Sequence, residues 1–476
     1  MSQQPVAIHW FRQDLRLADN PSLAAAVLGG RVLPIYILDD VNAGEHKMGG
    51  ASRWWLHHSL SALNDSLDGK LNIYQGEPCE IFKDLQQRFM VLSVSWNRCY
   101  EPWRIARDKK IKAMLGEEGI GVHSHNGSLL WEPWDVLKKD GTPYKVFTPF
   151  YRRGCLQKPA PRRPELAPSS LELIYDTEKS MSVSALALLP SIPWDKSLAP
   201  HWEIGEQGAS KKLDAFIRRR ANDYKEGRNY PAQKAVSGLS PHLHFGELSP
   251  QQVWDAMGKL PANDDIDCFQ SEIGWREFSY SLLYHFPSLP RNSLQAKFEQ
   301  FPWIESADYL NAWQKGMTGY PLVDAGMREL WQTGSMHNRV RMVVGSFLVK
   351  NLLLHWHHGE KWFWDCLVDA DLASNSAGWQ WIAGCGADAA PYFRVFNPVT
   401  QGEKFDKQGE YTRRYVPELA ALPDKYLFCP WEAPAGMLAA AGITLGETYP
   451  HPIVDVKASR ERALEAFRTL KNSAET

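Results

Sequence analysis

Short runs of β-branched and apolar residues recur through the first quarter of the chain, with helix-length stretches between them. The strand-like runs cover residues 6–10, 32–38, 71–74, 91–96 and, more weakly, 121–123. Two of the stretches between them, 52–67 and 104–115, have the length and pattern of amphipathic helices. Strands that alternate with helices are typical of a parallel sheet covered by helices on both faces. We therefore expect a Rossmann-like α/β domain over residues 1–135.

The turn after the first of these runs, His9 to Arg16, reads HWFRQDLR and contains no glycine. A dinucleotide-binding turn needs glycines so that the backbone can approach the pyrophosphate closely. The dinucleotide fingerprint is therefore missing, and the α/β domain is not expected to be the primary nucleotide site.

A proline-rich stretch from about 155 to 200 predicts a linker that crosses the surface, and we place the interdomain linker at residues 136–201. After Trp202 the strand-like runs stop and long amphipathic stretches replace them. These stretches predict an all-α domain over residues 202–476. They lie at 211–226, 250–258, 268–285, 324–333, 337–356 and 362–370, with a last one near 458–470.

The formal net charge of −2 gives the chain no overall attraction to nucleic acid, so a DNA contact has to come from a local basic patch. Solvated surface charge would produce the same clusters of basic residues. The candidates are Arg152, Arg153, Arg162, Arg163, Arg218, Arg219, Arg220, Lys225 and Arg228.

The chain has seven cysteines, an odd number, and no C-x-x-C pair. This usage favours a reducing cytoplasm and argues against a disulfide framework or a zinc site, so we expect no metal. The N-terminus shows no basic region followed by an apolar stretch, and no apolar run is long enough to cross a bilayer. We expect a cytoplasmic protein without a membrane partner.

Twenty of the 476 residues are tryptophan, which is more than packing alone ordinarily needs. Electron movement or base stacking would explain them. If the run Gly378–Trp381 is helical, Trp379 and Trp381 point to nearly opposite sides, because each residue turns by about 100°. One ring is then free for a cofactor and the other for a second cavity, although two core residues would fit the pattern equally well.

On a helix, Glu272, Trp275 and Arg276 share one face. A ring that stacks, a carboxyl group that accepts hydrogen bonds and a cation that meets a phosphate suit a flipped base. An amphipathic helix with an ordinary Glu–Arg pair would look the same.

Asn338, Arg341 and Met342 also share a helical face, and Asp369 is the natural partner of Arg341. An amide beside such a pair could line a flavin, although a structural ion pair is the alternative. The turn at Ser237 and Gly238 could present N–H groups to a phosphate, or could be a helix cap without a ligand.

Three long motifs in order resemble the photolyase/cryptochrome family: WFRQDLRLADN at 10–20, WQKGMTGYPLVDAGMR at 313–328 and AAPYFRVFNP at 389–398. The resemblance spans nearly the whole chain. It implies FAD, active in its reduced anionic form, within the helical domain. The residues that it assigns to the cofactor are Tyr224, Val236, Ser237, Gly238, Leu239, Ser240, Glu272, Arg276, Asn338, Arg341, Asp369, Asp371 and Asn375.

Asn375 would lie near the flavin N5, where repair enzymes of the family carry Asn, and so favours repair over signalling. The resemblance also implies an electron relay from Trp303 through Trp356 to Trp379. The relatives that act on (6-4) photoproducts have two histidines where this chain has Asn338 and Met342. The resemblance is therefore to a cyclobutane pyrimidine dimer photolyase, a carbon-carbon lyase that repairs DNA by light-driven electron transfer from FAD to a flipped-out dimer.

For that reaction the resemblance implies Glu272, Trp275, Asn338, Asn375 and Trp381 as catalytic residues. It implies Trp275, Arg276, Asn338, Arg339, Met342 and Trp381 as DNA contacts. Three positions depart from the family pattern. Ser335 stands where many relatives have Trp, and Val236 and Gly238 replace a hydroxyl residue and an Arg of the phosphate loop.

Glu101 resembles a partner of the antenna chromophore that the family holds in its α/β domain. Methenyltetrahydrofolate is the first expectation and 8-hydroxy-5-deazaflavin the alternative. A cryptochrome-like blue-light photoreceptor and a light-independent FAD redox protein are competing functions. The short C-terminus argues against the first, and the set Glu272, Trp275 and Trp381 against the second. A monomer is the family expectation.

Overall fold

The computed structural model describes residues 4–389, 392 and 394–472. Residues 390, 391 and 393 of the motif at 389–398 therefore lie outside the described residues. The chain divides into two compact units, each built from three separate segments. The first unit comprises Met1–Asn222, Ser237–Pro287 and Val368–Ala373, and the second comprises Asp223–Val236, Ser288–Leu367 and Ser374–Thr476.

A five-stranded parallel sheet organises the N-terminal part of the first unit, which confirms the predicted α/β class. The strand order is β3-β2-β1-β4-β5, so the order reverses between β1 and β4. In such sheets, ligands bind outside the carboxyl ends of the strands at this reversal. The strands are β1 (Val6–Phe11), β2 (Val32–Leu38), β3 (Asn72–Gln75), β4 (Val91–Asn97) and β5 (Gly121–His125).

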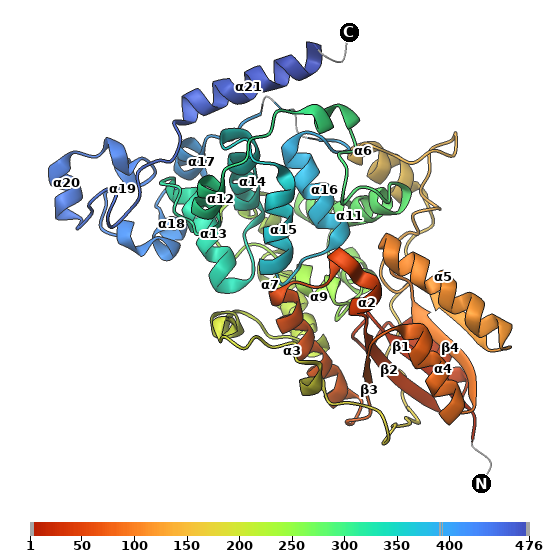
Figure 1. The fold of residues 1–476 in the computed structure, drawn as a ribbon. Coiled ribbons are helices and arrows are strands. Elements are labelled where there is room, and N and C mark those ends of the chain that lie inside the picture. The colour runs from red at the N-terminus through yellow and green to blue at the C-terminus, as the bar shows by residue number, and fades with distance from the viewer. Residues whose placement is uncertain (1–3, 390–391, 393, 473–476) are drawn as a thin grey trace. The chain divides into compact units, whose positions relative to one another are not determined.

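Both faces of the sheet are covered by helices (Figure 1), as the unbroken burial of β1 requires. Ala7 and Phe11 pack in a core with residues of α1 (Pro21–Leu28) and α3 (Gly50–Ser66). Ile8 and Trp10, which point to the other face, pack in a second core with residues of α4 (Pro78–Arg88) and α5 (Pro102–Glu117). A short helix, α2 (Asp40–Ala43), follows β2.

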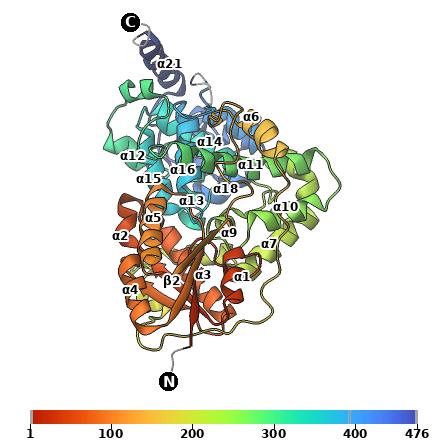
Figure 2. The same cartoon turned by 90° about the vertical axis from the view of Figure 1, so that its right-hand side faces the viewer.

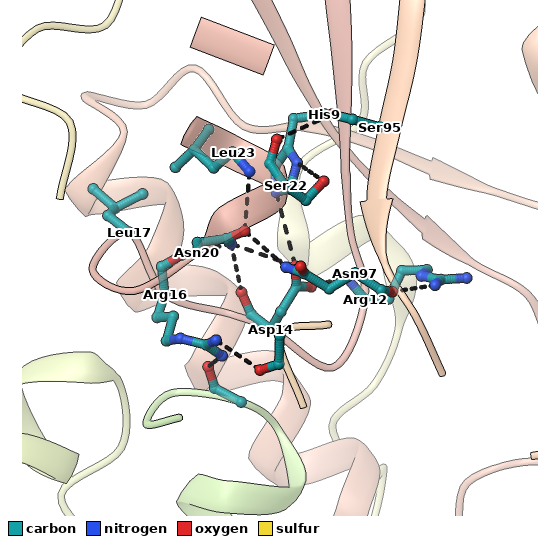
Figure 3. Close-up of polar contacts among 12 residues, drawn as sticks. His9, Arg12, Asp14, Arg16, Leu17, Asn20, Ser22, Leu23, Ser95 and Asn97 are labelled. Carbon is teal, nitrogen blue, oxygen red and sulfur yellow. Dashed lines mark hydrogen bonds and ion pairs between the residues drawn. The ribbon is translucent and has the colours of Figure 1, made fainter. Parts of the chain in front are cut away.

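The turn after β1 is filled by a buried network of side-chain hydrogen bonds (Figure 3). Asp14 accepts a hydrogen bond from the amide of Asn97 at 2.6 Å, and the same amide donates to Asn20 at 2.7 Å. Asn20 in turn caps α1, because its side chain accepts the N–H of Leu23 at 3.0 Å. This helix end is satisfied by the protein itself, which fits the missing glycine fingerprint.

The proline-rich segment lies along the edge of the same sheet. Met181 forms an antiparallel bridge with Ile73 of β3, and the Tyr74 hydroxyl donates to Asp176 at 2.8 Å. Just before the proline-rich segment, still within the predicted linker, α6 (Phe147–Pro149) leads into a wide turn over Phe150–Gly154. These contacts attach the segment to the first unit, whereas the predicted boundaries at 135 and 201 stay a prediction.

Beyond Trp202 the described residues form helices and no β-strand, as predicted (Figure 2). Among the described helices, none combines the length and the apolar character that crossing a bilayer needs. The first unit contains α7 (Glu206–Arg219), α9 (Ser240–His244), α10 (Pro250–Gly258) and α11 (Asp264–His285). The second contains α8 (Tyr224–Gly227), α12 (Ala307–Gln314), α13 (Pro321–Thr333), α14 (Asn338–Ser346), α15 (Trp356–Cys366), α17 (Pro398–Phe405), α18 (Glu410–Tyr415), α19 (Asp424–Leu427), α20 (Ala435–Ala440) and α21 (Val456–Asn472). Helix α16 (Leu372–Ala383) begins in the first unit and continues in the second.

The predicted continuous helix over 337–356 is wrong. Helix α14 widens into a π-turn over Phe347–Asn351, and Leu353 takes a left-handed backbone with φ 55°. A new helix then begins at Trp356, because the ring of His355 accepts the N–H of His357 and caps it.

Two other predicted helix ends are also wrong. Helix α15 ends at Cys366, so the stretch to Ala370 is not helical. Helix α7 ends at Arg219, before an Asn222-Asp223 pair that favours a turn.

Candidate functional site

One helix of the first unit carries the predicted lesion-binding face. Helix α11 begins where Asn263 accepts the N–H of Ile266 at 2.9 Å, and three acidic residues in its first turn favour its N-terminus. Glu272, Trp275 and Arg276 are helical and each is half-buried. The pattern of the sequence therefore placed these three side chains on one partly accessible face.

Arg276 makes its contacts inside the first unit. Its guanidinium donates to the Ser128 carbonyl at 2.8 Å and to Glu277 at 3.3 Å, and it lies 4.8 Å from the ring centre of Tyr280. Tyr280 stands four residues further along α11, so the helical spacing could have revealed this neighbour. The geometry suits a cation that organises the site, and the predicted contact with DNA stays a prediction.

Asp371 is joined to the same cluster through Tyr280, whose hydroxyl donates to the Asp371 carboxylate. His244 forms a second hydrogen bond to that oxygen at 3.2 Å. Burial alone would raise the pKa of Asp371, but the bonds from His244 and Tyr280 and the charge of Arg276 hold it well below the usual range. A buried carboxylate that stays ionised suits hydroxyl groups of a ligand. His244 and Tyr280 were not predicted, because no local pattern joins residues 244, 280 and 371.

The predicted phosphate turn has a cation that the sequence did not reveal. Gly238 adopts a left-handed backbone with φ 64°, and a Cβ built on it would lie 3.3 Å from the Lys212 ammonium nitrogen. Lys212 lies 4.6 Å from the Trp202 ring centre, and burial lowers its pKa. Ser237 accepts the N–H of Leu239 at 3.4 Å, and Ser240 begins α9.

In the second unit, α14 presents the predicted polar face. Asn338 is exposed, whereas Arg341 and Met342 are half-buried and follow at helical spacing. Arg341 donates to the Met336 carbonyl at 2.8 Å. Arg339 donates to Asn229 and lies 4.4 Å from the ring centre of Phe405. The guanidinium of Arg228 lies 5.3 Å from the ring centre of Tyr224.

Asn375 is buried on α16 and held by α15, since its amide donates to the Glu360 carbonyl at 3.0 Å. The next residue, Ser376, donates to the Glu360 carboxylate at 2.6 Å. The two bonds tie this part of α16 to α15, and the place of Asn375 beside the flavin stays a prediction.

Trp379 and Trp381 lie in different surroundings, as helical geometry predicts. Trp379 is buried edge-on against Phe363 at 4.9 Å and Trp313 at 6.2 Å, whereas Trp381 is half-buried. The Trp379 ring packs directly against Gly359 of α15, where a Cβ would lie only 2.0 Å from the ring. This glycine is needed for packing, and the sequence alone did not indicate it.

The other two tryptophans of the predicted relay differ in burial. Trp356 is fully buried, whereas Trp303 is half-buried. His355 is near both, with its ring centre 5.3 Å from that of Trp303 and 5.6 Å from that of Trp356. Burial therefore increases from Trp303 to Trp356, the direction that a relay from the surface needs.

Glu101 lies where the strand order reverses, just after β4. Its carboxylate accepts a hydrogen bond from Gln13, which follows β1, at 3.1 Å, and it pairs with Arg104 at 3.2 Å. The other carboxylate oxygen is buried and has no partner among the described residues. A buried acceptor at this edge suits a polar ring system.

Comparison with known proteins matches two family models to the chain. Residues 7–168 match the model described as DNA photolyase, and residues 269–469 match the FAD binding domain of DNA photolyase. The chain is also 50% identical to the deoxyribodipyrimidine photo-lyase of Agrobacterium fabrum, over 98% of both proteins.

The chain belongs to the DNA photolyase family. The crystal structure of a bacterial class III photolyase from Agrobacterium tumefaciens superposes with a TM-score of 0.95 and 49% identity, over 99% of both chains. Cryptochrome-1 of Arabidopsis thaliana is more distant, with 38% identity over 97% of this chain and 70% of that protein.

Proposed function

We propose that this chain is a deoxyribodipyrimidine photo-lyase, which uses light to split cyclobutane pyrimidine dimers in DNA. The observation that carries the proposal is its 50% identity, over nearly the full length of both chains, to a protein of that name. The lower identity to plant cryptochromes favours repair over a purely signalling role.

FAD is the cofactor that the matched domain implies, and the residues present fit it. In the first unit, the ionised Asp371 and the cation of Lys212 beside Gly238 are chemically matched to the hydroxyl and phosphate groups of FAD. Asp369, Glu272, Arg276 and the turn Ser237–Ser240 complete that set. In the second unit, Tyr224, Val236, Asn338, Arg341 and Asn375 would contribute. When bound and reduced, FAD supplies the excited electron donor that opens the cyclobutane ring.

The protein's own part is to hold the extruded dimer and to keep water away from it. Trp275 and Trp381 would stack against the pyrimidines, and Glu272 would accept hydrogen bonds from their imide edges. Asn338 and Met342 would also contact the dimer, and Arg339 would meet the DNA backbone. Trp303, Trp356 and Trp379 would pass electrons inward to restore the reduced cofactor.

We also propose an antenna chromophore at Glu101, with its unpartnered oxygen as the acceptor for a pterin N–H. Methenyltetrahydrofolate fits this acceptor, and 8-hydroxy-5-deazaflavin is the alternative. A monomer is the proposed state. The chromophore is extracted from the purified protein, and the absorption spectrum of the extract distinguishes the two antennae.

The repair proposal is tested with purified, flavin-loaded protein and an oligonucleotide that contains one dimer. Blue light is expected to restore the two thymines in duplex DNA, and a dark sample is the control. Persistence of the dimer in the light, with the flavin reduced, would show that the chain does not have this activity. A parallel single-stranded substrate tells whether both forms are repaired.

The relay is tested by replacing Trp379 with Phe. Photoreduction of oxidised flavin is expected to be lost, whereas chemically reduced protein still repairs dimers. Trp254→Phe is the control, because Trp254 packs against Trp131 in the first unit, whereas the three relay tryptophans belong to the second. Undiminished photoreduction in Trp379→Phe would contradict the relay assignment.

A further inference from the structure

Trp275 does not stand alone on α11. Phe147 stacks on it with ring centres 3.8 Å apart and planes 11° from parallel. Tyr151 lies nearly parallel to Phe147 as well, at 5.6 Å and 8°. Phe147 is therefore in contact with two nearly parallel rings, and both Phe147 and Tyr151 come from the segment that the sequence predicted to be a linker.

Edge-on contacts fix this stack from the side. Phe278, one turn after Trp275 on α11, lies 5.8 Å from Trp275 at 73° and 6.0 Å from Phe147 at 64°. Trp275 thus has a stacked neighbour on one face and an edge-to-face neighbour at its side, and edge-to-face contact is a favourable arrangement for aromatic rings. The planes of Trp275 and Phe147 are therefore held in two directions.

The linker segment is fastened to α11 at close range. A Cβ on Gly274 would lie 2.5 Å from the Tyr151 ring, so only glycine allows the approach of helix and ring at this point. Arg152 also forms an ion pair with Asp267 near the start of α11. That pair is half-exposed and contributes little by itself, so the packing of the rings dominates.

Phe147 covers one face of the Trp275 ring, so a base can stack only on the opposite face. Phe147 is itself buried, with 8% of its surface exposed, whereas Trp275 stays half-buried. A ring whose plane is already fixed loses little side-chain freedom when a ligand stacks on it. The backing ring thereby converts a mobile side chain into a preorganised binding surface.

We infer that Phe147 is a positioning residue of the dimer site, which holds Trp275 in the plane needed to stack on the extruded pyrimidines. This inference rests on the proposed function, because it takes Trp275 as the dimer-stacking ring. It assigns the rings of Phe147 and Tyr151 to the substrate site as its back wall.

The test compares two Phe→Leu variants of the full, flavin-loaded chain. Phe147→Leu keeps an apolar side chain but removes the stack. Phe150→Leu is the matched control: Phe150 lies in the same segment, is 2% exposed and packs against the rings of Phe278, at 5.1 Å, and Tyr144, at 6.2 Å. Both variants lose a buried aromatic ring, so they are expected to lose similar thermal stability.

Only Phe147→Leu is expected to weaken binding of duplex DNA that contains a dimer, by about tenfold, or about 1.4 kcal/mol. The KM for repair should rise accordingly while the repair rate at saturation and flavin photoreduction stay near wild type. Phe147→Tyr, which restores the ring, is expected to restore the KM. In a Trp275→Ala background, Phe147→Leu should produce no further loss of affinity.

Three outcomes would overturn the inference: an unchanged affinity in Phe147→Leu, an equal loss in Phe150→Leu, or a full additional loss in the Trp275→Ala background. Wild-type protein that neither binds nor repairs the dimer would instead refute the proposed function, so the two failures are distinguishable.

Discussion

Lys212 is the side chain that we expect to supply the cation that the sequence lacks at Gly238. The family resemblance places an Arg where this chain has Gly238, which weakens the expected phosphate loop. The structure brings the Lys212 ammonium group to within 3.3 Å of the point where that missing side chain would begin. Burial lowers the pKa of Lys212, and an ion that pairs with it would reverse that shift.

We therefore expect Lys212→Met to weaken FAD binding by about tenfold, because a charge-assisted hydrogen bond contributes about 1.5–3 kcal/mol. The fraction of flavin retained after dilution and gel filtration measures the loss. Lys211→Met is the control, since Lys211 is exposed and already pairs with Glu203. Equal flavin retention in both variants would exclude a role for Lys212 in holding the cofactor.

The residues that were predictable and those that were not differ in how they come together. Glu272, Trp275 and Arg276 lie within five positions of one helix, so the periodicity of the sequence was enough to place them on one face. Lys212 and Gly238, or His244 and Asp371, meet only because separate segments fold together, and periodicity carries no information about such pairs.

The helices and strands show the same division. The strands were predicted nearly to their ends, because most of them are apolar runs bounded by polar residues; β5, which reads GVHSH, was predicted two residues short. The break after α14 was missed, since Phe347, Leu352 and Leu353 continue an apolar pattern that reads as helix. The widened turn ends the first helix, and the cap that His355 provides begins the next one; neither leaves a periodic signal.

That widened turn contains Lys350, which is fully buried and donates to the Arg394 carbonyl at 2.9 Å. Burial, helped by the charge of Arg394, lowers the pKa of Lys350 to about 7. In the unfolded chain the pKa of this lysine is about 10.4. Between pH 7 and that value the unfolded chain therefore binds more protons than the folded chain. The contribution of Lys350 to stability is therefore present at high pH and is lost as the pH falls toward 7.

Lys350→Met is expected to remove this dependence. Wild-type protein should gain unfolding free energy between pH 7 and 9, by up to about 1.4 kcal/mol per pH unit from this group, and the variant should gain less. Urea unfolding at pH 7, 8 and 9 measures both slopes, with Lys361→Met at an exposed position as the control. Parallel slopes in wild type and Lys350→Met would contradict the assignment.

The full chain resembles its family more clearly than any one part does. Motifs near the N-terminus and in the helical region are enough to indicate the family, because a long motif constrains many positions at once. The division into two units was not readable in the same way. Each unit gathers three separate segments, and residues 368–373 belong with a sheet that begins more than 300 positions earlier. Local composition cannot reveal a boundary that the chain crosses repeatedly.

With a net charge of only −2, binding to DNA has to depend on a few local cations. Arg339 is a candidate, because it has no carboxylate partner among the described residues and because burial and the nearby Arg228 lower its pKa. A DNA phosphate that pairs with the Arg339 guanidinium would raise this pKa again. Arg339→Gln is expected to weaken binding to damaged and undamaged DNA alike, and to reduce the slope of log affinity against log salt by about 1.

Arg413→Gln separates this effect from a general loss of positive charge, because Arg413 already pairs with Asp424 at 2.7 Å. Binding measured at several salt concentrations should give this variant the wild-type slope, whereas the slope of Arg339→Gln should be shallower. Flavin photoreduction should be the same in both variants, because a phosphate contact affects the rate and affinity of DNA binding and not the cofactor. An equal slope in the two variants would contradict the phosphate contact at Arg339. Arg339 would then contribute no more to DNA binding than Arg413, which Asp424 already neutralises.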